Sequence, residues 1–152
     1  MRLDVIQLKE FYRGTELGRT TKQLINRVLE TKVDTKNGSL TLGFGFACPF
    51  LENKMKDSKN KNFLLLMPSE QGVISWPSKY KSVTALVDEV SWPINTSASD
   101  LILISHGLEV SDNQDLLLQE VLRVLKDSGK LIIPVSYTHL RAHETRGNLV
   151  CR

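Results

Sequence analysis

The stretch that most constrains the fold is residues 39–51, which read Ser-Leu-Thr-Leu-Gly-Phe-Gly-Phe-Ala-Cys-Pro-Phe-Leu. It begins as a short apolar strand and is predicted to turn at Gly43 and Gly45. A helix is predicted to begin near Pro49, because proline fits the first helical turn, where its missing N–H costs nothing. This order of elements lets a backbone approach a small molecule closely. The stretch therefore predicts either the floor of a nucleotide-type pocket or a tight turn in an α/β core that binds nothing.

Apolar runs alternate with helical patterns over the rest of the chain. Helices with apolar residues at helical spacing are predicted over 16–32 and 114–126. Strands are predicted over 62–67, 83–87 and 100–105, and another begins at Lys130. Such alternation implies parallel βαβ units with right-handed crossovers. The predicted fold class is α/β, a Rossmann-like parallel sheet flanked by helices.

Composition excludes several kinds of partner. The formal net charge is +3, and no block of consecutive Lys or Arg is interleaved with aromatic residues, so a nucleic-acid groove is not expected. No apolar run approaches membrane-spanning length, and the N-terminus lacks a signal-peptide core. Two cysteines, Cys48 and Cys151, form neither a disulfide framework nor a metal-ligand spacing. We expect a cytoplasmic protein that binds neither nucleic acid nor membrane.

The last 19 residues, Pro134–Arg152, differ in character from the rest of the chain. They resemble one reading frame of a transposon-type sequencing adapter, and we expect the native sequence to end near Ile133. Without this tail the chain holds 17 Lys and Arg against 16 Asp and Glu. The tail also contains His139 and His143, whose spacing would otherwise suggest a zinc site. We expect one domain over residues 1–133 and a non-native tail over 134–152.

The N-terminal residues 1–33 are expected to form a helical cap. Amphipathic helices are mostly packing elements, which favours a cap that rests on the edge of the sheet. The alternative is a lid over a bound cofactor, with Tyr12 or Arg19 touching the cofactor. The sequence leaves both roles open.

In parallel sheets ligands bind outside the carboxyl ends of the strands. The residues expected to line a pocket therefore follow the predicted strands, at 43–46, 67–70, 88–89 and 105–109.

Residues 83–133 resemble the second half of a class I S-adenosylmethionine-dependent methyltransferase of the type 11 kind. The family places an acidic residue after its third strand, then a segment that ends in Leu-Pro, then an apolar strand that begins with Phe-Asp. Asp88, Trp92-Pro93 and Asp100–Leu103 match this order and spacing. The family helix that ends Arg-Val-Leu-Lys-Pro-Gly-Gly is matched by Glu120–Gly129, with Asp127 and Ser128 in place of Pro and Gly. The resemblance covers residues 39–133.

The resemblance implies S-adenosylmethionine as the cofactor. Its amino-acid end would lie against the backbone of the glycine turn, its adenine near the acids after the third strand, and its ribose near Glu70. The residues that the resemblance assigns to the cofactor are Gly43, Gly45, Phe46, Glu70, Asp88, Glu89 and Ser105. The family sheet also has two further strands, so we expect this sheet to be incomplete at its C-terminal edge.

Methyl transfer from a sulfonium needs little acid or base chemistry, because positioning of the acceptor supplies much of the effect. His106 and Glu109 follow the fourth predicted strand, where a small-molecule acceptor would enter. His106 is the candidate catalytic base for an acceptor O–H or N–H. The alternative is a loop histidine with local hydrogen bonds.

Two further hypotheses stay open. Thr41 or Leu42 replaces the family's acid before the glycine turn, and the second strand ends Met67-Pro68, which favours a non-catalytic relative that acts as a binding module. A nicotinamide-binding oxidoreductase is the other hypothesis. It lacks support because the third glycine of the dinucleotide fingerprint is absent and no acid ends the second strand. The sequence does not determine the oligomeric state.

Overall fold

The structure, a computed structural model, describes residues 4–32, 38–57, 62–78 and 81–134. Over these residues the chain forms one five-stranded sheet with four helices packed on it. The elements are α1 (Val5–Gly14), α2 (Glu16–Lys32), β1 (Thr41–Gly45), α3 (Cys48–Asp57), β2 (Phe63–Pro68), β3 (Thr84–Val87), β4 (Ser99–Ser105), α4 (Gln114–Val124) and β5 (Leu125–Ile132). Apart from Pro134, the predicted tail lies outside the described residues. Within the described part, no helix combines the length and apolar character needed to cross a membrane.

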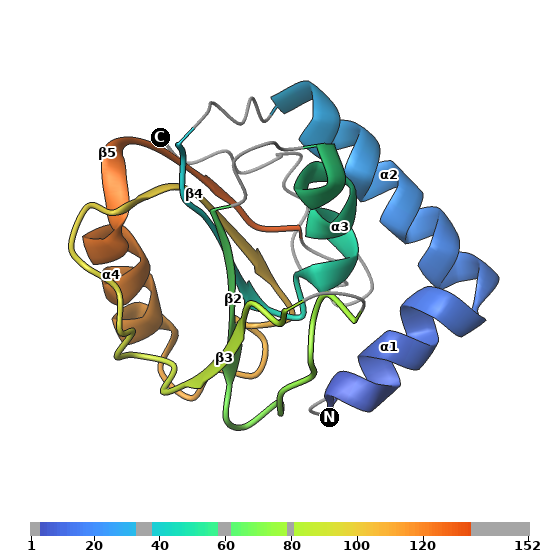
Figure 1. Cartoon of the computed structure of the whole chain (residues 1–152). Coiled ribbons are helices and arrows are strands. Elements are labelled where there is room, and N and C mark those ends of the chain that lie inside the picture. The colour runs from blue at the N-terminus through green and yellow to red at the C-terminus, as the bar shows by residue number, and fades with distance from the viewer. Residues whose placement is uncertain (1–3, 33–37, 58–61, 79–80, 135–152) are drawn as a thin grey trace, which may run out of the picture.

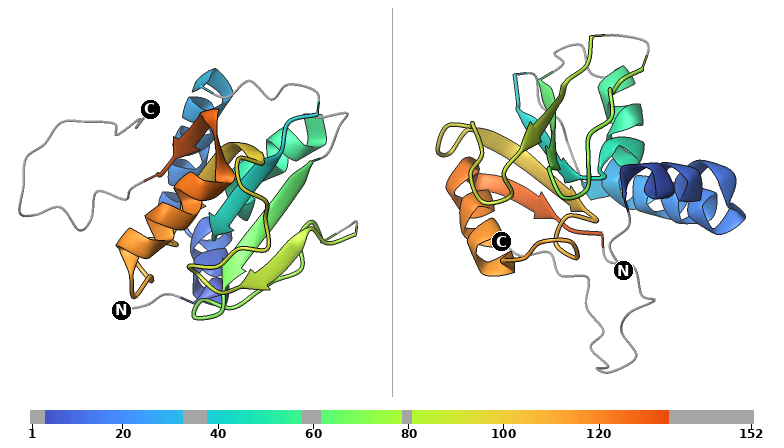
Figure 2. Two further views of the ribbon diagram at one scale, coloured as in Figure 1. Left: turned by 90° about the vertical axis from the view of Figure 1, so that its left-hand side faces the viewer. Right: turned by 90° about the horizontal axis from the view of Figure 1, so that it is seen from below.

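The strand order is β3-β2-β1-β4-β5, and every neighbouring pair is parallel. Figure 1 shows α1, α2 and α3 on one face of the sheet and α4 on the other, and the right-hand view of Figure 2 shows the same layers. The predicted α/β sheet is therefore confirmed. The chain passes from β1 to β2 on one side and later enters β4 on the other side, so the topological switch point lies beside β1.

Gly43 is not part of the turn that the sequence predicted. It lies inside β1, where it is opposite Leu65 of β2 and Leu103 of β4. A Cβ atom at this position would stand 2.6 Å from Leu65 Cδ1 and 2.9 Å from the Ala47 Cβ. The glycine therefore makes room for α3 and β2 to pack on β1, and the turn itself begins at Gly45.

The boundary between α4 and β5 also differs from the prediction. The helix ends at Val124, two residues before the predicted end, and β5 begins at once with Leu125 rather than at Lys130. Leu125 pairs with Ser99, whereas Lys130 pairs with Leu101, so residues 126–129 form an irregularity in the ladder. Residues Asp127–Gly129, which follow the predicted helix, therefore lie inside this bulged strand.

The N-terminal helices α1 and α2 lie on the same face of the sheet as α3 (Figure 1). Asp4 begins α1 with a capping box, since its side chain accepts from the backbone N–H of Gln7 and the Gln7 side chain accepts from the Asp4 N–H. The helix buries Val5, Leu8 and Tyr12 against the core. The apolar positions of α2 divide between core and surface: Leu29 is buried and Ile25 half-buried, whereas Leu17, Leu24 and Val28 are exposed.

Arg123 and Glu120 of α4 hold the connection between β3 and β4. The guanidinium donates to both carboxylate oxygens, at 2.6 and 2.8 Å, and also to the Trp92 carbonyl at 3.3 Å. Glu120 in turn accepts the Trp92 backbone N–H at 2.7 Å. The segment Glu120–Gly129, which resembles the family helix, thus has a structural role, because its Glu120 and Arg123 hold Trp92 against the apolar core under α4.

The ion pair between Glu120 and Arg123 predicts that the stability of the fold decreases at acidic pH. Hydrogen bonds from Arg123 lower the pKa of Glu120 below its ordinary 4.5, against the effect of burial. A carboxyl whose pKa is lower in the folded state stabilises the fold above its unfolded pKa, and this contribution is lost as the pH falls through the folded value. Glu120→Gln is expected to lower the Tm at neutral pH by roughly 5 °C.

Melting curves followed by circular dichroism at neutral pH and at about pH 3 test this prediction. The difference between Glu120→Gln and the parent chain should shrink at the lower pH. Glu52→Gln is the control, because Glu52 pairs with Lys22 and Lys56 at the surface, where ion pairs contribute little. A Tm difference for Glu120→Gln that does not change with pH would contradict the role assigned to its charge.

Candidate functional site

The carboxyl ends of β1 and β4 meet at the switch point. Gly45 lies opposite Ser105 in the parallel ladder, and the next residue, Phe46, donates its backbone N–H to the Ser105 carbonyl at 2.7 Å. Three of the predicted cofactor residues, Gly45, Phe46 and Ser105, are therefore in direct backbone contact. Ser105 and Phe46 are each only 2% exposed.

Position 45 requires a glycine, both because of its backbone conformation and because of the atoms around it. Its φ is +74°, a left-handed conformation that residues with a Cβ rarely adopt. A Cβ here would stand 2.4 Å from the Ser105 carbonyl oxygen and 2.9 Å from the Gly107 nitrogen. The glycine therefore allows β1 to turn into α3 immediately beside the loop that follows β4.

Tyr12 of α1 reaches this edge of the sheet. Its ring stacks on Phe46, with centroids 6.0 Å apart and planes at 18°, and meets Phe50 edge-on at 5.3 Å. Of the two residues considered for a lid, Tyr12 lies at the predicted site. Arg19 is exposed on α2 and donates to the Arg13 carbonyl.

The hydroxyl of Tyr12 lies 2.7 Å from Nε2 of His106, the candidate catalytic residue. His106 has φ of +54°, which is uncommon for a residue other than glycine and carries backbone strain. Its carbonyl accepts a hydrogen bond from Gln71 Nε2 at 3.0 Å. His106 is therefore held from two sides, by α1 and by the turn after β2.

The electrostatic surroundings favour neutral side chains here. Burial, together with the nearby charge of Glu109, raises the pKa of Tyr12 to about 12. Burial lowers the pKa of His106, and the charge of Glu109 opposes this shift. Both shifts favour the uncharged form of the ring.

Gln71 is a residue that the sequence analysis did not identify. It is 3% exposed, its backbone carbonyl accepts the Val5 N–H at 3.1 Å, and its amide N–H group is the donor to His106. The other amide atom, Oε1, is buried and has no hydrogen-bond partner among the described residues. Buried polar atoms without partners are rare and mark places where a donor from a ligand or water is expected. No motif marks Gln71 in the sequence, because its burial results from the contacts of three separate elements.

The predicted acids lie at the same edge but serve different contacts. Asp88 accepts the backbone N–H of Val90 within the loop after β3, at 2.9 Å. Glu89 accepts the Asp112 N–H at 3.2 Å and so ties that loop to the loop after β4. Glu70 is exposed in the turn after β2 and is adjacent to Gln71. Since β3 is two strands from β1, Asp88 and Glu89 lie about 10 Å away from the β1 turn.

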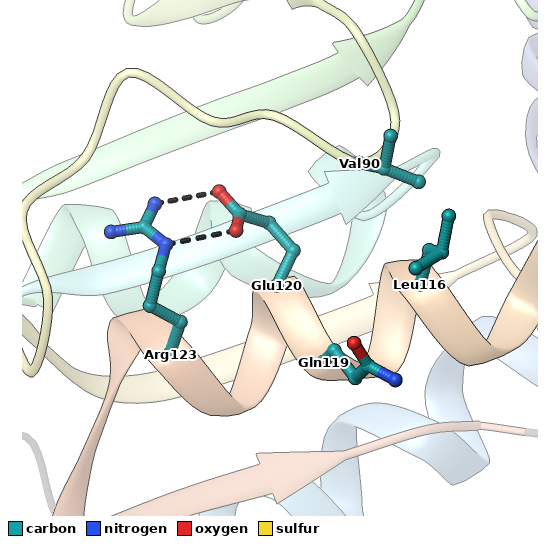
Figure 3. A pocket seen from close by; sticks show the side chains of 5 residues that line it. All are labelled: Val90, Leu116, Gln119, Glu120 and Arg123. Atoms are coloured by element: carbon teal, nitrogen blue, oxygen red, sulfur yellow. Dashed lines mark hydrogen bonds and ion pairs between the residues drawn. The ribbon is translucent and has the colours of Figure 1, made fainter.

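A cavity of about 330 Å³ opens elsewhere, between α4 and the loop after β3. It is lined by Val90, Leu116, Gln119, Glu120 and Arg123, and Figure 3 shows the Glu120–Arg123 pair on one side of it. None of these residues is among the predicted cofactor contacts. The described residues contain no group of three or more His, Cys, Asp or Glu side chains that could hold a metal ion.

Comparisons with known proteins agree with this fold. Among solved structures, the fold is similar to a methyltransferase from Thermotoga maritima, described as S-adenosylmethionine-dependent and a possible histamine N-methyltransferase. The TM-score is 0.60 and the identity 14%, over 83% of this chain and 56% of that chain. It is also similar to an S-adenosylmethionine-dependent methyltransferase from Aquifex aeolicus, with a TM-score of 0.62 and 16% identity, over 86% of this chain and 72% of that chain.

A third similar structure is phosphoethanolamine N-methyltransferase 2 from Haemonchus contortus, in complex with S-adenosyl-L-methionine. The TM-score is 0.54 and the identity 13%, over 82% of this chain and 34% of that chain. This chain thus spans little more than half of the Thermotoga protein and a third of the Haemonchus protein. A search of curated protein sequences gives no match.

The structural similarities, at identities below 25%, establish the fold. The family itself is shown by the sequence, because the family model described as a methyltransferase domain matches residues 40–133, more than half of the chain. The matched region begins just before β1 and ends just after β5, so it contains the whole sheet and α4. The chain belongs to the methyltransferase domain family.

Proposed function

We propose that this chain binds S-adenosylmethionine at the carboxyl edge beside β1, and that the whole protein transfers its methyl group to a small-molecule acceptor. The observation that carries the proposal is the switch point itself, where Gly45 brings the β1 turn against Ser105 and where Gln71 presents a buried oxygen without a partner. The family match over the same sheet supports it.

The residues present fit the chemistry of this cofactor. Its ammonium and ribose hydroxyl groups are hydrogen-bond donors, and Gln71 Oε1 is an acceptor that has no partner in the described part of the chain. We propose that Gly45, Phe46 and Ser105 supply backbone contacts at the turn, with Gly43 behind them in β1. Glu70, Asp88 and Glu89 are proposed as the polar side chains along the rest of the edge.

When bound, the cofactor would supply an activated methyl group on a positively charged sulfur. The task left to the protein is to orient the acceptor and to exclude water. The loop 105–110, which follows β4 and contains His106, is the proposed entrance for the acceptor. A cytoplasmic location and one functional domain within residues 1–133 are part of the same proposal.

Calorimetric titration of S-adenosylmethionine into the chain tests this proposal. We expect saturable binding, and Gln71→Leu should weaken it about tenfold, because one hydrogen bond to a charged or polar ligand group is lost. Gln119→Leu is the matched control. Gln119 is an exposed glutamine that lines the cavity beside α4, so its replacement should leave the Kd unchanged.

No binding at millimolar cofactor would contradict the proposal. It would favour the non-catalytic relative, in which the stacked rings of Tyr12 and Phe46 complete the edge of the sheet without a ligand. A loss of affinity in Gln119→Leu but not in Gln71→Leu would move the binding site to the cavity beside α4.

A further inference from the structure

We propose that Tyr12 fixes the tautomer of His106 and so makes this residue a hydrogen-bond donor, through Nδ1–H, to an oxygen atom of a bound ligand. The inference deepens the proposed function, on which its chemical purpose rests. It changes the role of His106 from a base that removes a proton to a side chain that orients a carboxylate or carbonyl oxygen. Tyr12 is a positioning residue in this scheme, because it acts through His106.

The direction of the Tyr12–His106 hydrogen bond follows from the chemistry of the two groups. A neutral imidazole has one nitrogen that donates and one that accepts. Burial raises the pKa of Tyr12 to about 12, so at neutral pH its hydroxyl carries a proton that it can donate. A phenol O–H is a stronger acid than a neutral imidazole N–H, and it is therefore the better donor at the 2.7 Å separation from Nε2.

Donation by Tyr12 occupies the lone pair of Nε2. The ring proton of neutral His106 must then be on Nδ1, which leaves the imidazole with a donor and no free acceptor. A histidine in this state cannot take a proton from a substrate while Tyr12 is in place. It can hold an oxygen atom of a ligand at the carboxyl edge.

Both partners are held firmly enough to define this contact. The Tyr12 ring packs between Phe46 and Phe50, and Tyr12 is 6% exposed. The backbone of His106 is held by the hydrogen bond from Gln71 to its carbonyl. The hydrogen bond therefore joins α1 to the loop after β4, two segments that are 94 residues apart in the sequence.

Nitrogen NMR of the histidine side chains in the ¹⁵N-labelled chain tests the inference without any cofactor or activity. His106→Asn identifies the signals of His106, since asparagine tolerates a positive φ. In the parent chain, neutral His106 should be almost entirely in the Nδ1–H form. In Tyr12→Phe, the population should move mostly to the Nε2–H form that free histidine prefers in water.

The pKa of His106, measured by titration, is a second test, and two variants should shift it in opposite directions. Among the described residues, the Tyr12 hydroxyl of α1 contacts the ring, and the charge of Glu109 in the same loop acts on it. Tyr12→Phe removes a hydrogen bond that stabilises the neutral ring, so it should raise the pKa of His106. Glu109→Gln removes a negative charge and should lower this pKa, with the tautomer unchanged.

If neutral His106 carries its proton on Nε2 in the parent chain, the inference is overturned. A lower pKa of His106 in Tyr12→Phe would overturn it too, because either result means that the Tyr12 hydroxyl accepts the hydrogen bond from His106. Once His106→Asn has identified the signals, the parent chain decides the tautomer even if Tyr12→Phe fails to fold. Addition of S-adenosylmethionine, or of its decarboxylated analogue, then identifies the oxygen. A shift of Nδ1 with the first ligand alone assigns the cofactor carboxylate, whereas equal shifts with both exclude it and assign another oxygen. These results do not depend on catalysis, so they are separable from failure of the proposed function.

Discussion

Gly45→Ala is expected to destabilise the domain by about 3 kcal/mol. Alanine must adopt the left-handed conformation at φ of +74°, and its Cβ must also displace the Ser105 carbonyl oxygen, which stands 2.4 Å from the ideal Cβ position. The atoms in the way are backbone atoms of β4 and of the loop after it, so they cannot move without disturbing the sheet. Urea unfolding followed by circular dichroism measures the loss.

Gly38→Ala is the matched control for this experiment. Gly38 also has a positive φ, of +83°, but no atom of the described residues lies within 4 Å of the position where a Cβ would be added. The control therefore has only the conformational cost, about 1 kcal/mol. Equal losses for the two variants would show that the close approach of β1 and β4 contributes nothing.

The expected loss of stability at Gly45 limits which variants can test the function. A bulky residue at Gly45 would separate a catalytic protein from a non-catalytic relative only if both variants kept their fold, because only the first would then lose activity. Since the structure places Gly45 against the backbone of β4, such a variant should lose its fold in either case. Gln71→Leu is the better variant, because it changes a side chain and not the backbone of the turn. It removes an Oε1 that has no partner among the described residues, together with the hydrogen bond from Nε2 to the His106 carbonyl.

Phe44→Ala is expected to destabilise the domain by about 4 kcal/mol. Phe44 is fully buried in β1, on the face that α4 covers, and its ring stacks on Trp92 with centroids 5.0 Å apart and planes at 27°. It also fills the space beside Gly107, where a Cβ would stand 2.6 Å from the Phe44 Cδ1. Removal of the ring leaves a cavity between β1, the Trp92 loop and the loop after β4.

Urea unfolding is again the measurement, and Trp92 fluorescence should change in the native state of the variant. Leu122→Ala is the control, because Leu122 lies on α4 with 64% of its surface exposed and its truncation should cost no more than about 0.5 kcal/mol. A loss below about 1 kcal/mol for Phe44→Ala would mean that the core under α4 collapses around the missing ring.

The candidate site was predictable in part. Strand ends are local signals, so the sequence placed Gly45, Phe46 and Ser105 at the edge where they meet. It could not assign Gly43 correctly, because a glycine inside a strand and a glycine in a turn look alike until the neighbour is known. The neighbour here is Leu65, 22 positions further along the chain.

The sequence was enough to predict the α/β class, the bounds of α2 and the approximate positions of β1 to β4, because burial selects apolar residues at helical spacing in helices and in continuous runs in parallel strands. Tertiary structure alone decided that Tyr12 meets His106, that Gln71 keeps a buried oxygen without a partner, and that α4 passes into β5 without a loop. Each of these depends on packing between segments that are distant in the chain. Local periodicity records that a side chain is buried but not which side chain it is buried against.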